Sequence, residues 1–217
     1  IMEALFKSGI FGTPSLIKTH ELSKNDPRVM IEGGDVLVVN EDILLIGNGA
    51  RTSSEGIDLL VKEFCKFGTG RKHVVVQQLP HSPESFIHLD MVFTLLDHDK
   101  AMIYKPLIMS GSPYQTVHIE IEHGRVSKIS QADGILPLLR RLGVELDPVV
   151  CGGKADEWNQ EREQWHSGAN FLAIAPGKVI SYARNIHTLE ELNENGFEVV
   201  AANEVIQGKY DLESSGR

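Results

Sequence analysis

A histidine and an aspartate stand two residues apart in an apolar segment, at His88-Leu89-Asp90. We predict a strand from about His88 to Leu96, and side chains two residues apart on a strand point to the same face. An imidazole and a carboxylate on one face can transfer protons and hold a cation. The pattern is also typical of a solvated strand end. A metal site would need a third ligand, and Asp97 and His98 belong to a turn a strand-length away.

Three further segments contain residues that could do chemistry. Glu32-Gly33-Gly34-Asp35 opens a strand, and its two glycines allow a ligand or another backbone to approach closely between two acids. Arg51 follows Gly47-Asn48-Gly49-Ala50 at a strand-to-helix connection, where a guanidinium suits a bidentate pair with a carboxylate. The third segment, from Gly168 to Asn185, is predicted to be mainly a scaffold hairpin. Taken alone, each segment also fits an ordinary structural role.

Short strands and helices alternate around these residues. Asp35–Asn40 and Ile43–Gly47 are apolar, β-branched runs separated by two residues, which predicts a β-hairpin. A capping box at Thr52-Ser53-Ser54-Glu55 precedes apolar residues at helical spacing, so we predict a helix over about residues 53–66. A strand over His73–Gln78 follows. The order is strand, strand, helix, strand, or ββαβ.

The same order is predicted twice more along the chain. A second unit comprises strands at Thr116–Glu122 and Arg125–Ile129, a helix at Asp133–Leu142 and a strand at Pro148–Val150. A third comprises strands at Phe171–Ala175 and Val179–Tyr182, a helix from a capping box at Thr188 to a C-cap at Gly196, and a closing strand at Phe197–Val200. About three ββαβ units therefore account for most of the sequence.

The chain is predicted to form one α/β domain over residues 1–217, because no linker-like run of Pro, Ser or Gly divides it. Cys151–Gln164 has no clear apolar period and is predicted to be a long excursion from the repeating units. The longest apolar runs hold at most five residues, whereas a bilayer span needs about twenty, so no membrane segment is expected.

Charge and cysteine content limit the class of protein further. Lys and Arg number 21 against 30 Asp and Glu, giving a net charge of −9 that disfavours nucleic acid as a partner. The two cysteines, Cys65 and Cys151, form no Cys-x-x-Cys or Cys/His framework, which favours a reducing compartment. We therefore expect a cytoplasmic protein.

The motifs, taken together and in order, resemble a known family. They are Glu-Gly-Gly-Asp, Gly-x-Gly-x-Arg-Thr, His-Leu-Asp-x-Val-Phe-Thr, Glu-Arg-Glu-Gln-Trp-x-x-Gly-x-Asn and Tyr-x-Arg-Asn, spread from Ile31 to about Val200. This set resembles arginine deiminase and the guanidino-group-modifying (amidinotransferase) superfamily. The resemblance implies the pentein fold, an α/β propeller of five ββαβ modules. This chain is expected to hold an incomplete propeller, without the N-terminal part of the family.

The resemblance also implies a role for several residues. Glu32 matches the catalytic glutamate, His88 the general acid and base, and Asp90 a carboxylate that grips the guanidinium. Arg51 and Arg217 match arginines that bind the α-carboxylate of the substrate. In such enzymes a cysteine thiolate attacks the guanidinium carbon, and neither a metal nor an organic cofactor is implied.

The sequence departs from the family pattern at several positions. The nucleophilic cysteine of the family follows a Gly-Arg pair by a few residues, and this chain stops at Gly216-Arg217. Cys65 is predicted to be a core thiol, and Cys151 lies in a turn outside any matching motif. A second guanidinium-binding aspartate of the family is absent here. Ala50 and His166 stand where deiminases often carry Glu and Asp, which leaves the substrate open.

Three functional hypotheses remain. The first is a hydrolase that converts free arginine to citrulline and ammonia in the full-length protein, through a cysteine thiouronium intermediate, with residues 1–217 alone inactive. The second is an amidinotransferase or a deiminase of a modified guanidine. The third is a non-catalytic guanidinium-binding module. The expected partner is a small guanidino substrate such as arginine, with no nucleic acid and no membrane, and homo-oligomers are left open.

Overall fold

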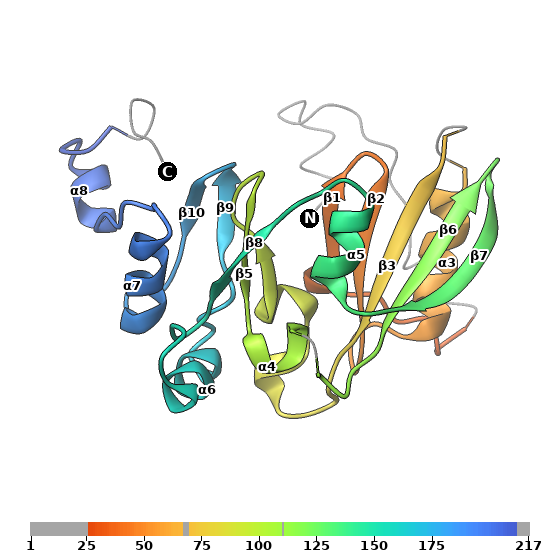
Figure 1. Cartoon of the computed structure of the whole chain (residues 1–217), viewed down its shortest axis with the longest axis horizontal. Coiled ribbons are helices and arrows are strands. Elements are labelled where there is room, and N and C mark those ends of the chain that lie inside the picture. Colours follow the sequence, from red (N-terminus) through yellow and green to blue (C-terminus); the bar gives the residue numbers. More distant parts are fainter. Residues whose placement is uncertain (1–25, 67–69, 110, 212–217) are drawn as a thin grey trace.

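The computed structural model describes residues 26–66, 70–109 and 111–211 of this chain (Figure 1). The first predicted ββαβ unit is confirmed. It consists of β1 (Val36–Asn40), β2 (Ile43–Asn48), α3 (Ser54–Phe64) and β3 (Lys72–Gln78). β1 and β2 form an antiparallel hairpin, and β2 pairs in parallel with β3 after the crossover through α3.

Helix α3 begins one residue later than the predicted capping box implies. Ser53 is the N-cap, and its hydroxyl accepts a hydrogen bond from the Gly56 N–H at 3.1 Å. Thr52 is unavailable for that role because its buried hydroxyl accepts the backbone N–H of Glu32 at 3.1 Å. The start of the helix is thereby tied to the segment that contains Glu32.

The second unit is assembled differently from the prediction. The hairpin of β6 (Thr116–Glu122) and β7 (Arg125–Ala132) is confirmed, but it pairs with β3 and extends the first sheet to the order β1-β2-β3-β6-β7. The unit that includes α5 (Ile135–Arg141) and β8 (Asp147–Val150) takes its hairpin from β4 (Phe93–Leu95) and β5 (Lys100–Ile103) instead. Ile121 of β6 explains the difference, because it is buried beneath α3 in the same cluster as Val74 of β3.

The third unit is only partly formed in the described residues. β9 (Leu172–Ala175), β10 (Lys178–Ile180) and α7 (Ile186–Glu194) are present, and Gly196 has the positive φ expected just after the end of a helix. The predicted start at Thr188 is wrong, because the N-cap is Asn185. The predicted strand at Phe197–Val200 is also wrong: Phe197 packs into a core cluster, but Val199 is 48% exposed and no strand forms there.

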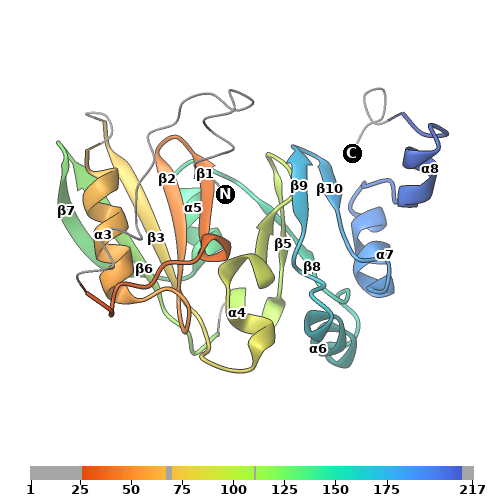
Figure 2. The same ribbon diagram turned by 180° about the vertical axis from the view of Figure 1, so that it is seen from behind.

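Three short helices complete the described chain: α4 (Lys105–Ile108), α6 (Glu157–Trp165) and α8 (Ala202–Ile206). Helix α6 falls mostly within Cys151–Gln164, the segment predicted to be a long excursion from the repeating units, where no helix was predicted. Figure 1 and Figure 2 show α6 and α7 on the side of the molecule away from the five-stranded sheet. In residues 26–66, 70–109 and 111–211, no helix is both long and apolar enough to span a bilayer.

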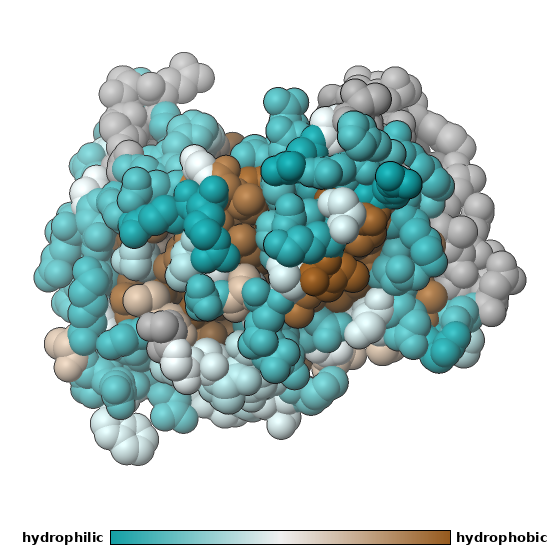
Figure 3. Space-filling view, turned by 45° about the vertical axis from the view of Figure 1, so that its right-hand side comes forward, coloured by the Kyte–Doolittle hydropathy of each residue, from teal (hydrophilic) through white to brown (hydrophobic). Residues whose placement is uncertain are grey.

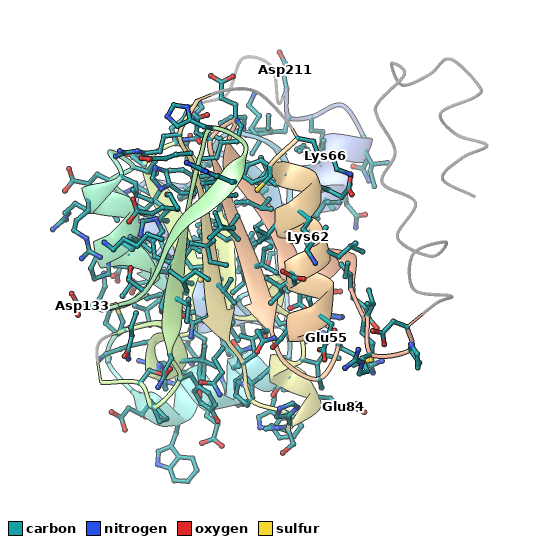
Figure 4. The ribbon with its side chains drawn as sticks, turned by 90° about the vertical axis from the view of Figure 1, so that its right-hand side faces the viewer. Glu55, Lys62, Lys66, Glu84, Asp133 and Asp211 are labelled. Atoms are coloured by element: carbon teal, nitrogen blue, oxygen red, sulfur yellow. The ribbon has the colours of Figure 1, made fainter. Side chains whose placement is uncertain are left out.

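The five-stranded sheet carries apolar side chains on both faces. Ile57 and Val61 of α3 cover one face, whereas Glu55 and Lys62 of α3, and Lys66 just after its end, lie on the solvent side (Figure 4). The largest core cluster lies on the other face, where α5 and the β4-β5-β8 sheet pack. Figure 3 shows brown, apolar surface between mainly polar side chains on one side of the molecule. This α/β arrangement places the N-terminal end of β1 beside the segment that leads into β4, and the candidate site lies between them.

Candidate active site

The segment His88-Leu89-Asp90 does not lie on a strand. His88 has extended backbone and is followed by one turn of 3-10 helix at Leu89–Met91, and β4 begins only at Phe93. The prediction that strand alternation aligns the two side chains is therefore wrong. The reason is Leu89, which is fully buried and whose N–H donates to the carboxylate of Asp35 at 2.8 Å.

His88 and Asp90 nevertheless flank the same point of the molecule, because Gly34 lies against both. A Cβ added to Gly34 would lie 3.0 Å from Oδ1 of Asp90 and 3.0 Å from Cγ of His88. Gly34 belongs to a 3-10 turn over Gly33–Asp35 that leads into β1. The absence of a side chain at Gly34 thus leaves room for the imidazole and the carboxylate side by side.

Glu32 joins this pair directly. The Nε2 atom of His88 lies 2.6 Å from Oε2 of Glu32, a short hydrogen bond in which the ring N–H donates to the carboxylate. Oε1 of Glu32 lies 3.5 Å from a guanidinium nitrogen of Arg51. Four of the five predicted site residues are therefore gathered at one place, while Arg217 lies outside the described residues.

The electrostatics of the site distinguish its two carboxylates. Glu32 is partly exposed and pairs with both His88 and Arg51. Asp90 is more deeply placed: burial raises the pKa of its carboxyl, and His88 and the side chain of Asn170 oppose that rise. Among the described residues, Oδ1 of Asp90 has no hydrogen-bond partner. A buried carboxylate oxygen without a donor is suited to receive the N–H groups of a bound cation.

Asp35 supports the site from beneath. It is fully buried, and burial raises the pKa of its carboxyl, while the Thr52 hydroxyl and the Leu89 N–H oppose that rise. Its carboxylate lies against Gly47, where an added Cβ would overlap Oδ1 of Asp35 and come within 2.8 Å of Leu79. Two motifs singled out in the sequence, Glu-Gly-Gly-Asp and the glycines before Arg51, therefore meet at Asp35 and Gly47.

This close contact predicts that Gly47→Ala will destabilise the fold. Something must move to admit the new methyl group, so we expect the free energy of unfolding to fall by about 1–3 kcal/mol. Gly70→Ala is the matched control, since no described residue lies within 4 Å of a Cβ added there. Urea denaturation of both variants measures the difference. Equal stability of the two variants would contradict this view of the Asp35 contact.

Two further side chains hold the backbone of the turn, and sequence reasoning assigned neither of them a role. The Asn170 amide donates to the Asp90 carbonyl at 3.2 Å, and the Thr94 hydroxyl shares its one proton between the same carbonyl, at 3.0 Å, and that of Ala169, at 2.8 Å. Both residues belong to the motifs that resemble the family, and this membership is the sequence signal that could have identified them. These bonds tie the turn to the segment that precedes β9.

Neither described cysteine belongs to this site. Cys151 is buried against Gly168 and Thr188, and burial raises the pKa of its thiol to about 12. Cys65 follows the last residue of α3, and burial raises the pKa of its thiol as well. In the part of the chain that the structure describes, no three His, Cys, Asp or Glu residues form a group that could hold a metal ion.

Comparisons with known proteins give relatives of this chain. A family model described as "Arginine deiminase" matches residues 2–209. The chain is 38% identical over 180 residues to an arginine deiminase of Bacillus cytotoxicus, covering 81% of this chain and 43% of that protein. It is 38% identical over 179 residues to an arginine deiminase of Lactococcus lactis, covering 78% and 42%. The chain thus spans less than half the length of these relatives.

A solved structure supports the fold. The N-terminal domain of ArgZ, crystallised with a covalently bound reaction intermediate, aligns with a TM-score of 0.50 and 18% identity, over 95% of this chain and 59% of that one. At this identity the likeness concerns the arrangement of the elements. The family model covers almost the whole sequence, and on that ground this protein belongs to the arginine deiminase family.

Proposed function

We propose that this chain is part of an arginine deiminase-like hydrolase that, as a complete polypeptide, converts free arginine to citrulline and ammonia. The observation that carries the proposal is the 2.6 Å contact between His88 and Glu32 beside the half-buried carboxylate of Asp90. A guanidinium is planar and cationic, so two flanking carboxylates can bind and orient it. An imidazole beside them can transfer the protons that the reaction needs.

The proposed reaction has two halves. A cysteine thiolate from outside the described residues attacks the guanidinium carbon, the bond from carbon to one nitrogen breaks, and His88 protonates the departing ammonia. His88 then takes a proton from water, which attacks the same carbon and displaces the sulfur as thiolate. The products are one ammonia and one ureido compound. In this scheme Glu32 and Asp90 hold the guanidinium throughout.

Product analysis tests the reaction class. The complete polypeptide supplied with arginine is expected to release ammonia and citrulline in equal amounts. Transfer of the guanidino group to an added amine, without release of ammonia, would instead indicate an amidinotransferase. We expect residues 1–217 alone to be inactive, because the proposed nucleophile is absent from the site that they form.

Arg51 is proposed to bind the α-carboxylate of the substrate. Its guanidinium rests near Oε1 of Glu32 in this structure, and its side chain is 48% exposed. An exposed pair of this kind contributes little to stability, so the guanidinium can leave Glu32 at small cost. The proposal requires that movement, because the substrate guanidinium takes the place beside Glu32.

Arg51→Ala is therefore expected to raise KM for arginine by about tenfold or more, with a smaller change in kcat. Agmatine lacks the α-carboxylate and serves as the control substrate. Steady-state kinetics of the complete polypeptide with both compounds measure the effect. If agmatine were the better substrate of the unmutated enzyme, the role proposed for Arg51 would be wrong.

A further inference from the structure

Gln164 of α6 connects to both ends of the segment that carries His88. Its Nε2 atom donates to the carbonyl of Ser85 at 2.9 Å and to the carbonyl of Met91 at 2.7 Å. The side chain is fully buried. A primary amide has two N–H donors on one nitrogen, so one glutamine can hold two carbonyls at a fixed separation. The two carbonyls bracket His88, three residues before it and three after it.

Helix α6 is fixed independently of Gln164. The buried carboxylate of Glu163 accepts the backbone N–H groups of His187 at 2.9 Å and Thr188 at 2.7 Å, and also the Thr188 hydroxyl at 2.7 Å. Glu163 therefore caps the first turn of α7 and secures the two helices to each other. These hydrogen bonds hold α6 in place, and α6 in turn holds the side chain of Gln164.

The segment from Ser85 to Met91 depends on such external contacts. It contains short 3-10 turns at Glu84–Phe86 and Leu89–Met91 and forms no sheet pairing that would hold it in place. Asp35 holds it from one side through the Leu89 N–H. Gln164 holds it from the side of α6. Together with the bonds from Asn170 and Thr94 to the Asp90 carbonyl, these attachments set the directions of His88 and Asp90.

We infer that Gln164 is a positioning residue for His88 and Asp90, acting through the backbone of residues 85–91. The inference rests on the proposed function of the same site. Without the amide, the two carbonyls lose their common donor, and the turn can move relative to Glu32. A displacement of about 1 Å in a catalytic group costs up to about 100-fold in rate. The expected loss therefore falls on kcat rather than on stability alone.

Gln160 offers a matched control on the same helix. Gln160 and Gln164 are both buried glutamines that donate to backbone carbonyls, and in both the Oε1 atom has no partner among the described residues. Gln164→Met and Gln160→Met each remove a buried amide and conserve the side-chain volume approximately. Of the two amides, that of Gln164 donates to the segment that carries His88, whereas that of Gln160 donates to Gly153.

The experiment compares these variants in the complete polypeptide. Gln164→Met is expected to lower kcat by about 10- to 100-fold with KM within about threefold, whereas Gln160→Met keeps kcat within about threefold. Equal losses of kcat in the two variants would overturn the inference. If Gln164→Met does not fold, Gln164→Asn replaces it, because the shorter side chain keeps the amide but cannot reach both carbonyls. The same loss of kcat is expected.

Hydrogen exchange of the Leu89 amide separates this inference from the proposed function. This N–H is held by Asp35 in the ordered turn. Exchange is expected to be at least about tenfold faster in Gln164→Met than in Gln160→Met, whether or not the polypeptide deiminates arginine. Unchanged exchange at Leu89 would show that Gln164 does not position the turn. If Leu89 exchanges faster in Gln164→Met but the unmutated protein does not turn over arginine, the proposed function is refuted. The positioning role of Gln164 then still stands.

Discussion

His88→Ala in the complete polypeptide is expected to lower kcat for arginine by about 1,000-fold or more. Both proton transfers of the proposed reaction pass through this imidazole, and general acid and base catalysis typically contributes about 100- to 10,000-fold. The loss should appear in kcat and in kcat/KM alike, because Glu32 and Asp90 still bind the guanidinium. Steady-state release of ammonia measures it.

His98→Ala is the control for this prediction. His98 is exposed in the turn between β4 and β5, close to His88 in sequence but outside the cluster of Glu32, Asp90 and Arg51. We expect it to retain nearly full activity. A kcat for His88→Ala close to that of His98→Ala would remove His88 from the mechanism.

Asp90→Asn is expected to change activity and stability in opposite directions. The neutral amide cannot balance the charge of a guanidinium, so kcat/KM should fall by about 100-fold or more. The carboxylate is costly to keep in the folded state, because burial raises its pKa and Oδ1 lacks a partner among the described residues. Removing the charge is therefore expected to raise Tm near pH 7 by roughly 2–4 °C.

The sign of the pH dependence follows from the raised pKa of Asp90. Between its unfolded and folded pKa values, the folded protein binds more protons than the unfolded chain, so this group's contribution to stability falls as pH rises. The higher Tm of Asp90→Asn is thus expected near pH 7, and the difference in Tm should vanish below the pKa of the unfolded chain, near pH 4. Thermal unfolding at both values of pH tests this. A lower Tm of the variant at pH 7 would contradict it.

Elements with strong local patterns were predictable from the sequence. The β1–β2 hairpin, helix α3 and strand β3 agree with their predicted ranges to within a residue or two. The apolar spacing of Ile57 and Val61 specifies which face of α3 packs on the sheet. Local periodicity is sufficient in such cases because the buried face belongs to the element itself.

The turn at His88–Asp90 was not predictable in the same way. Its sequence favours a strand, but the Leu89 N–H pairs with Asp35, which lies 54 residues earlier in the chain. Helix α6 was missed for a related reason. Glu163 and Gln164 are buried although polar, because their partners are backbone groups of α7 and of residues 85–91. Contacts between distant segments leave no periodic signal.

The grouping of strands into units also depends on distant contacts. The hairpin of β6 and β7 was predictable from its alternation, whereas its partner strand was not. The hairpin pairs with β3 through β6, because Val74 of β3 and Ile121 of β6 share a buried cluster beneath α3. The gathering of Glu32, His88 and Asp90, expected only from the resemblance to the family, is the part of the site that the geometry supports most directly.

The most direct measurement is the structure of the complete polypeptide, with its nucleophilic cysteine replaced by alanine, bound to arginine. We predict that the guanidinium nitrogens lie within hydrogen-bond distance of the carboxylates of Glu32 and Asp90, with the imidazole of His88 beside the guanidinium carbon and Arg51 moved to the α-carboxylate. A guanidinium bound elsewhere, with Glu32 still paired to Arg51, would contradict the account.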